Sequence, residues 1–250
     1  VMMRRAAALA FARMAIAQPV LDYFRVPKTG STYMVHYFST HFEECRGLAV
    51  HDHGKGCHGA SCNASLLGPD AVALSVLRDP VEHFASQFDH MLRNFIRFEP
   101  AEAGQGPFYE WLREAVRDCS DASCRIDQLD GAYERVRARR NGALARLNVT
   151  TKDGLKPLGA DHVVVLYPQA LFVGAGRREI VCYSPDVSAD VNAVLRHHGL
   201  GKCVVPPPDP LDRHANGDRN HESHETAFSR REVCGLYPED CRLFDEYCRH

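Results

Sequence analysis

Residues 21–42, LDYFRVPKTGSTYMVHYFSTHF, pass from an apolar run through a short loop into a helical pattern, and this passage indicates the class of fold. Leu21–Val26 has the apolar character of a short strand and stops at Pro27, whereas Ser31–Phe42 has the spacing of a helix. A loop that leads into a helix N-terminus attracts anions, because its backbone N–H groups can donate to them and the N-terminal end of the helix dipole carries a partial positive charge. We therefore predict a strand–loop–helix unit that holds a phosphate-like group.

The loop itself, PKTGST, carries side chains suited to such a group. Lys28 supplies a positive charge, and Gly30 lets backbone N–H groups approach an anion closely. Thr29, Ser31 and Thr32 add hydroxyl groups. Because the lysine precedes the glycine, the order differs from the G-x-x-x-x-G-K-[ST] loop of ordinary nucleotide triphosphatases. A helix capped by Ser or Thr would explain the hydroxyls but not the lysine.

A second strand-to-helix passage, AVALSVLRDPVEHFASQF, covers residues 71–88. Ala71–Leu77 is a buried-strand pattern, and Val81–Phe95 follows at helical spacing. Arg78 therefore ends a strand, at the edge where ligand crevices form in open α/β sheets. Its guanidinium can hold a phosphate at two points, and Ser86, two turns into the helix, can reach the same anion.

The rest of the chain continues the alternation of strands and helices. We expect helices at Phe108–Cys119, Gln128–Leu147, Val187–His198 and Glu225–Arg249, strands at Asp161–Leu166 and Glu179–Tyr183, and loops at Gly47–Gly59 and Cys203–Arg219. This order indicates one α/β domain with a central, largely parallel sheet flanked by helices. We assign the domain to residues 21–250 and expect residues 1–20 to form an N-terminal helical arm or the remnant of a leader.

The composition is that of a globular protein, with 45% hydrophobic and 25% charged residues and a formal net charge of −2. It excludes a collagen, a coiled coil, a disordered tail and a membrane bundle, and gives no bulk attraction to nucleic acid. The ten cysteines and the sequons at Asn63 and Asn148 favour a disulfide-bonded glycoprotein over a cytosolic protein with free thiols. The apolar run Ala6–Ala12 is too short to cross a bilayer. If the protein is located in the Golgi, we expect its membrane anchor to lie outside this chain.

The PKTGST loop and the LRDPVEHFASQF segment resemble the two cofactor-binding elements of the membrane-associated carbohydrate sulfotransferases, Golgi enzymes that sulfate glycosaminoglycans and other glycans. The patterns at Val187–Leu200 and Glu225–Tyr247 are similar to that family in outline. The resemblance implies a P-loop-like fold and O-sulfotransferase activity on a glycan or polysaccharide. The sulfuryl donor would be 3′-phosphoadenosine 5′-phosphosulfate (PAPS), and no metal is expected. The residues implied to hold the 5′-phosphosulfate are Lys28, Thr29, Gly30, Ser31 and Thr32, and those for the 3′-phosphate are Arg78 and Ser86.

Sulfuryl transfer needs a base for the acceptor hydroxyl and a cation for the leaving phosphate. Lys28 is the expected leaving-group stabiliser. His51 and His53 are the candidate bases, because a histidine with a pKa of about 6.5 accepts a proton near neutral pH. Their place between the two cofactor motifs resembles that of the H-x-H pair of uronyl 2-O-sulfotransferases, although the glycine- and cysteine-rich residues that follow depart from that pattern. Glu43 and Glu44 are reserve candidates.

Other readings of the same residues stay open at this point. The His- and Cys-rich loop after His51 has ligand types that suit zinc, but Cys57 or Cys62 can instead form a disulfide. A P-loop kinase would need magnesium and a Walker-type loop, which the sequence does not match. A nucleotide- or glycan-binding domain without a catalytic base is the non-enzymatic alternative. The acceptor sugar, the disulfide pairing and the oligomeric state are not indicated by any motif.

Overall fold

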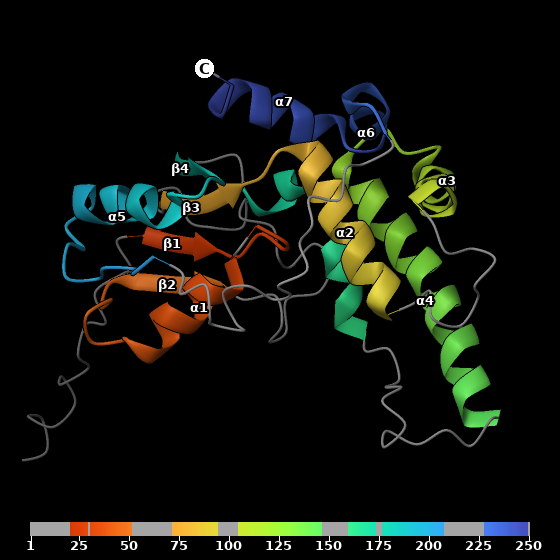
Figure 1. The fold of residues 1–250 in the computed structure, drawn as a ribbon, viewed down its shortest axis with the longest axis horizontal. Helices are drawn as coiled ribbons and strands as arrows, with labels where there is room; N and C mark the ends of the chain where they lie inside the picture. Colours follow the sequence, from red (N-terminus) through yellow and green to blue (C-terminus); the bar gives the residue numbers. More distant parts are fainter. Residues whose placement is uncertain are drawn as a thin grey trace, which may run out of the picture.

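The computed structural model describes residues 21–29, 31–51, 72–94, 105–146, 160–173, 177–207 and 228–249, so the arm expected at residues 1–20 lies outside the described residues. Four parallel strands form one sheet in the order β2-β1-β3-β4 (Figure 1). Their bounds are β1 Leu21–Phe24, β2 Leu48–His51, β3 Val72–Leu77 and β4 Arg177–Cys182. This confirms the predicted α/β fold with a parallel sheet.

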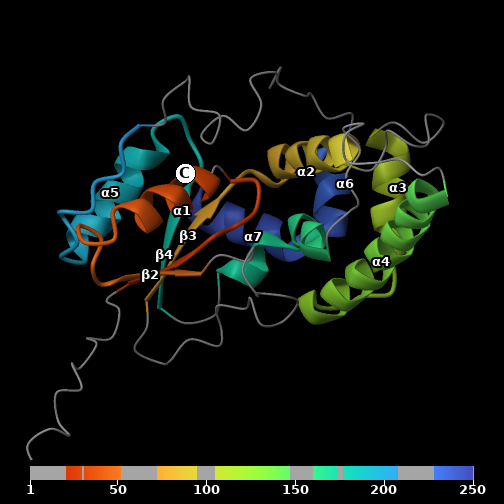
Figure 2. The ribbon, with the colours of Figure 1, turned by 90° about the horizontal axis from the view of Figure 1, so that it is seen from below.

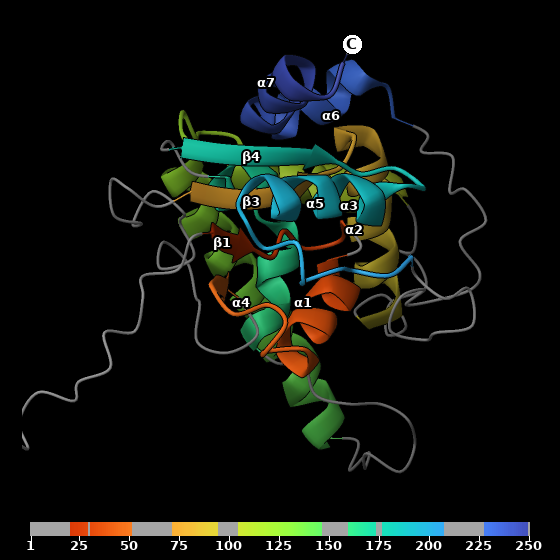
Figure 3. The ribbon, with the colours of Figure 1, turned by 90° about the vertical axis from the view of Figure 1, so that its left-hand side faces the viewer.

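Helices cover both faces of this sheet (Figures 2 and 3). One face is covered by α1 (Ser31–Thr40) and α5 (Val187–His197), and the other mainly by the remaining elements. These are α2 (Pro80–Asn94), α3 (Gln105–Val116), α4 (Ala122–Arg146), α6 (Arg230–Leu236), α7 (Pro238–Tyr247) and the 3₁₀ helices η7 (Ala160–Leu166) and η8 (Gln169–Phe172). Successive strand residues point to opposite faces, so Tyr23 joins the core of α1 and α5 while Phe24 joins the core of α2 and α4.

The start of α2 agrees with the sequence signal. Asp79 Oδ1 accepts the backbone N–H groups of Val81, at 2.8 Å, and Glu82, at 3.4 Å, and so caps the helix. Pro80 occupies the first helical position, where a missing N–H costs nothing. The cap fixes the direction in which the chain leaves β3, directly beside Arg78.

Two strand predictions were wrong. Asp161–Leu166, expected to be a strand, lies in η7, whose residues 163–166 are all buried. An uninterrupted apolar run can be a buried strand or a buried helical segment, and periodicity does not separate the two. Conversely, Leu48–His51 forms strand β2, although these residues belong to the expected loop Gly47–Gly59. The strand has only four residues, and the glycine-, histidine- and cysteine-rich sequence that follows conceals it.

Two helix boundaries also differ from expectation. α4 begins at Ala122, inside the expected cysteine-containing turn. The C-terminal helical region is divided into α6 and α7 at Tyr237, since Pro238 starts a new helix. A capping box between Ser229 and Glu232 fixes the start of α6.

Disulfides tie these elements together. All eight cysteines among the described residues are paired, as Cys45–Cys203, Cys119–Cys124, Cys182–Cys248 and Cys234–Cys241. Disulfides of this number are typical of proteins in oxidising compartments. In the part of the chain that the structure describes, no helix combines the length and the apolar character needed to cross a membrane.

Candidate functional site

The strand order defines a candidate crevice. From β1 the chain passes through α1 to β2 on one side, whereas β3 lies on the other side of β1. In open parallel sheets, ligands bind where the order reverses in this way, outside the carboxyl ends of the two central strands. The loops at that point are the one that follows β1 and contains Lys28, and the one that follows β3 and contains Arg78. The two sequence motifs therefore meet at the carboxyl ends of the two central strands.

The loop after β1 has a constrained backbone. Lys28 has φ of 63°, a left-handed conformation that is uncommon for any residue with a side chain. The Thr29 hydroxyl donates to the carbonyl oxygen of Val26 at 2.9 Å, and Thr29 is fully buried. Since that proton is used within the turn, Thr29 has only its backbone N–H to offer an anion. Gly30 and the side chain of Ser31 lie outside the described residues.

Two side chains from beyond β3 hold this loop in place. The Arg78 guanidinium donates through Nη1 to the carbonyl oxygen of Lys28 at 3.2 Å. His83, on α2, donates through Nε2 to the carbonyl oxygen of Pro27 at 2.9 Å. Burial lowers the pKa of His83 to about 3, so the imidazole is neutral. No sequence pattern indicates this contact, because His83 and Pro27 are 56 residues apart.

Arg78 is held from several sides. Its Nε donates to Glu82 Oε2 at 3.2 Å, and its guanidinium lies 4.9 Å from the centre of the Tyr183 ring, which is 39% exposed. The backbone N–H of Arg78 donates to the side-chain oxygen of Gln169, and the Gln169 amide donates back to the carbonyl of Arg78. This double contact fixes the backbone at the end of β3, so the guanidinium is presented from a rigid position.

Polar side chains of the C-terminal helices support that position from behind. Asp240, on α7, accepts the backbone N–H groups of Gln169 and Ala170, each at 2.9 Å. Burial raises the pKa of Asp240 to about 7, and the two N–H groups oppose this rise. Arg230 of α6 donates to Asp79 Oδ2 at 2.8 Å. The C-terminal helices thus support the turn Arg78–Pro80 between β3 and α2.

Arg25 is a further cation that the sequence analysis missed. It lies at the end of β1, and its Nη2 donates to the Thr32 hydroxyl at 2.9 Å. Thr32 therefore accepts one hydrogen bond and keeps its own proton for another acceptor. The available signal for Arg25 was its place two residues before Pro27, where the strand passes into the PKTGST loop.

Ser86 lies on the buried part of α2 and is 4% exposed. It follows Glu82 by one turn and shares a helix face with His83, which contacts the loop at Pro27. Ser86 is thus one turn further along α2 than the residues that contact Arg78 and the loop after β1. Its contact with an anion stays a prediction.

His51 forms a pair with Asp22. The His51 Nε2 lies 2.7 Å from Asp22 Oδ1, and the ring stacks on Phe24 at 4.3 Å between ring centres. A carboxylate can only accept, so Nε2 carries the proton and the Nδ1 lone pair faces away from Asp22. Asp22 is buried, and it was not singled out by the sequence analysis. His53 lies outside the described residues.

The reserve bases lie elsewhere. Glu43 and Glu44 are exposed in the turn between α1 and β2, and Glu43 pairs with Arg46. Gly47 of this turn accepts the N–H of Leu21, the first residue of β1. The turn is therefore at the amino edge of the sheet, opposite the Lys28 loop, and the structure does not bring either glutamate to the crevice.

Comparison of the chain with models of protein families, with curated proteins and with solved structures found no match.

Proposed function

We propose that this protein is an O-sulfotransferase that moves a sulfuryl group from PAPS to a hydroxyl of a glycan or polysaccharide. The observation that carries the proposal is the hydrogen bond from Arg78 Nη1 to the carbonyl oxygen of Lys28, 3.2 Å long. It joins two cationic elements on either side of the point where the strand order reverses. PAPS has two separate anionic ends, a 5′-phosphosulfate and a 3′-phosphate, and two adjacent cationic elements suit such a ligand.

The loop after β1 is the proposed holder of the 5′-phosphosulfate. Lys28 supplies the charge, and Thr29, Gly30 and Ser31 supply backbone N–H groups where α1 begins. Thr32 keeps a hydroxyl proton to donate, because Arg25 already donates to its oxygen. These donors fit an anion with several oxygens.

The Arg78 side of the crevice is the proposed holder of the 3′-phosphate. The planar guanidinium can bind two phosphate oxygens at once, and Ser86 is the second proposed contact. The partly exposed Tyr183 ring beside Arg78 offers a face on which the adenine can stack. Glu82 is paired with Arg78 and would have to give way to the phosphate.

The proposed reaction is one in-line displacement. The donor supplies an activated sulfuryl group: its S–O bond to the phosphate breaks while a bond to the acceptor oxygen forms. Lys28 offsets the charge that develops on the departing phosphate oxygen. His51 takes the acceptor proton on Nδ1, with Asp22 holding the other ring nitrogen, and His53 is the alternative base. No metal is required in this scheme.

The proposed location is the Golgi lumen or another compartment of the secretory pathway. The four disulfides support it, because they persist in oxidising surroundings. The sequons at Asn63 and Asn148 agree with it but lie outside the described residues.

The test is calorimetric binding of 3′-phosphoadenosine 5′-phosphate to the full chain, with adenosine 5′-phosphate and with ATP plus magnesium as comparisons. We expect binding that depends on the 3′-phosphate and that is lost in Lys28→Ala and in Arg78→Ala. Arg78→Lys separates charge from shape, and we expect it to recover only part of the affinity because an ammonium cannot bind two oxygens side by side. A transfer assay with labelled PAPS and a panel of polysaccharides then identifies the acceptor.

Lys202→Ala is the matched lysine control, since Lys202 is exposed in the turn after α5. It should bind like the wild type. Indifference to the 3′-phosphate, or preference for ATP with magnesium, would overturn the sulfotransferase proposal in favour of a phosphotransferase. Binding without transfer to any acceptor would leave a nucleotide-binding domain.

A further inference from the structure

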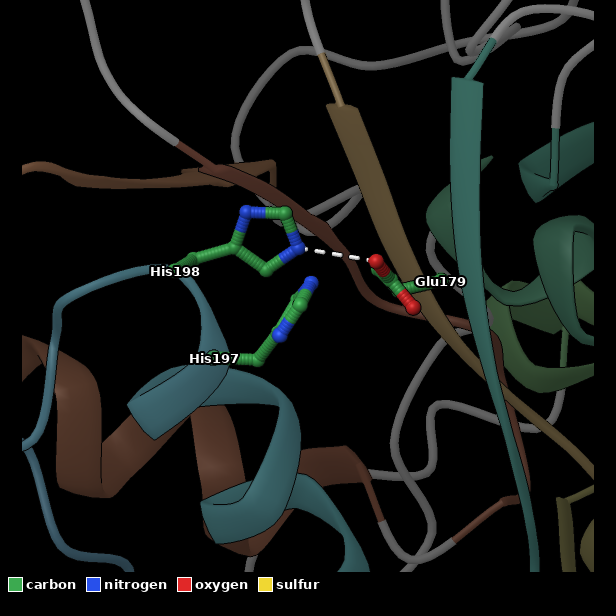
Figure 4. Close-up of side chains that lie close together, drawn as sticks. All are labelled: Glu179, His197 and His198. Carbon is green, nitrogen blue, oxygen red and sulfur yellow. Dashed lines mark hydrogen bonds and ion pairs between the residues drawn. The ribbon is translucent and has the colours of Figure 1, made fainter.

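A second group of polar side chains lies away from the crevice. Glu179, in β4, and His197 and His198, at the end of α5, each present a ligand atom, and these atoms all lie within 4.8 Å of one another. His198 Nε2 and Glu179 Oε1 are 2.8 Å apart. Figure 4 shows the two imidazoles and the carboxylate facing a common space between the helix end and the strand.

We propose that Glu179, His197 and His198 form a binding site for a divalent transition-metal ion of the zinc type. Two imidazoles and one carboxylate are a set that zinc prefers, and they leave a fourth position for water. Tetrahedral zinc at about 2.0–2.1 Å from each ligand places ligand atoms about 3.3 Å apart. The spacing of 2.8 Å between His198 and Glu179 and the upper limit of 4.8 Å for the whole set are close to that value, so small side-chain rotations would close the site.

The backbone that carries the histidines is already fixed. Gly199, with φ of 76°, ends α5 in a Schellman motif: its N–H donates to Arg196, and the Leu200 N–H donates to Leu195. A few residues further on, Cys203 forms a disulfide with Cys45, which lies in the turn between α1 and β2. The two imidazoles therefore need little ordering when a metal binds.

The electrostatics of the position also favour a cation. The carbonyl end of α5 carries the negative end of the helix dipole, and the Glu179 carboxylate adds a full negative charge. Glu179 is 34% and His198 12% exposed at the side chain, so the ion would be partly shielded from water. His197 is exposed and leaves a path for entry.

The site is separate from the proposed sulfotransferase reaction. α5 runs back from the carboxyl end of β4, so its last residues lie toward the amino edge, away from Lys28 and Arg78. A bound ion would fasten α5 to the edge strand β4, in addition to the existing contact between His198 and Glu179. The expected role is therefore stabilisation, and loss of the ion should leave nucleotide binding unchanged.

The test is titration of the metal-free full chain with zinc chloride, followed by calorimetry and by thermal unfolding. We expect one zinc per chain that raises the unfolding temperature. This equivalent should bind at least about tenfold more weakly in His197→Ala and in Glu179→Gln, since loss of a direct ligand costs no less than loss of its hydrogen-bond partner. Cobalt(II) in place of zinc should give the visible absorption of a tetrahedral site, and both variants should lose it.

His36→Ala is the matched control, because His36 is exposed on α1 and outside the cluster. It should keep both the affinity and the cobalt spectrum. His197 is exposed, so His197→Ala should unfold at the wild-type temperature in the absence of metal. Equal zinc affinity and stoichiometry in wild type, His197→Ala and Glu179→Gln would overturn the proposal, as would absence of any zinc binding by the wild type.

Discussion

The Nε2–H of His83 donates to the carbonyl oxygen of Pro27 across 2.9 Å and so joins the buried side of α2 to the loop after β1. The imidazole is 1% exposed, and burial lowers its pKa from 6.5 to about 3, with smaller contributions from Arg78 and Lys28. In the folded protein His83 is therefore neutral, whereas in the unfolded chain it takes up a proton near pH 6.5. Acid should weaken the folded state through this residue.

The first prediction concerns His83→Gln, which keeps an amide donor for Pro27 but cannot titrate. Between about pH 6.5, the pKa of His83 in the unfolded chain, and about pH 3, its pKa in the folded protein, the unfolded wild type holds one more proton than the folded protein. The contribution of the neutral His83 to the free energy of unfolding is therefore complete above about pH 6.5 and decreases as the pH falls. From about pH 7 to about pH 5, the free energy of unfolding should fall about 2 kcal/mol less in the variant. Urea unfolding at several pH values measures it. A variant profile parallel to that of the wild type would show that His83 is not buried as a neutral ring.

The second prediction has the opposite sign. Burial raises the pKa of Asp240 from 3.8 to about 7, so between these values the folded protein holds the extra proton. The contribution of Asp240 to the free energy of unfolding is then greatest at low pH and decreases as the pH rises toward 7. Asp240→Asn imitates the neutral carboxyl and removes the titration. Relative to the wild type, the variant should become more stable as the pH rises from about 4 to about 7, by about 1.4 kcal/mol per pH unit.

The same urea unfolding series tests Asp240→Asn. Because His83 and Asp240 act in opposite directions, their effects offset each other in the wild type, and only the single variants reveal either slope. A constant difference between Asp240→Asn and wild type from about pH 4 to about pH 7 would mean that Asp240 is ionised in the folded protein over this range.

The sequence was most informative where the signal is local. The LDYFRV run, Pro27 and the hydroxyl-rich start of α1 lie within one short stretch, and the structure has the predicted strand, loop and helix there. Asp79 and Pro80 likewise mark the start of α2 by their own capping chemistry. Local propensity and turn chemistry suffice for such elements.

The parts that could not be predicted depend on partners far along the chain. Gln169 holds the backbone of Arg78 from 91 residues away, and Asp22 meets His51 only because β1 and β2 pair in a particular register. The apolar residues 163–166 form a 3₁₀ helix, since β4 occupies the place beside β3. Tertiary contacts of this kind leave no pattern in the neighbouring sequence.

The third prediction concerns the competition between Glu82 and a bound phosphate. Glu82 is largely exposed and accepts a hydrogen bond from Arg78 Nε at 3.2 Å. The Arg78 guanidinium is also the group proposed to hold the 3′-phosphate. Glu82→Gln removes the negative charge that attracts Arg78 and repels the phosphate, and leaves only a neutral, weaker acceptor in its place. Exposed ion pairs contribute about 0.2–1 kcal/mol, so affinity for 3′-phosphoadenosine 5′-phosphate should rise about 1.4- to 5-fold.

Calorimetry at low salt measures this change, with Glu43→Gln as the control because Glu43 pairs with Arg46 at the opposite edge of the sheet. The gain should shrink as salt screens the exposed charges. Weaker binding by Glu82→Gln than by the wild type would mean that Glu82 orients Arg78 for the ligand rather than competing with it.

The last prediction separates a catalytic from a structural role for the pair formed by His51 and Asp22. If His51 is the base, His51→Ala should lower kcat by about 10²- to 10⁴-fold and leave nucleotide affinity unchanged. Asp22→Asn tests the tautomer: an amide N–H in place of the carboxylate can donate to Nε2, which moves the ring proton to Nδ1 and removes the lone pair that would accept the acceptor's proton. It should therefore lower kcat although the imidazole is still present.

Both variants are to be assayed with the acceptor found in the polysaccharide panel, over a range of pH and beside their unfolding curves. A base at this position acts on the acceptor alone, so both variants should lose rate while nucleotide affinity and the unfolding curves stay close to those of the wild type. Full activity in His51→Ala would assign the base elsewhere, with His53 the next candidate. A loss of stability and nucleotide binding in proportion to the loss of rate would mean that the pair only fastens β2 to β1, because a base that acts on the acceptor has no reason to affect the folded state or the nucleotide.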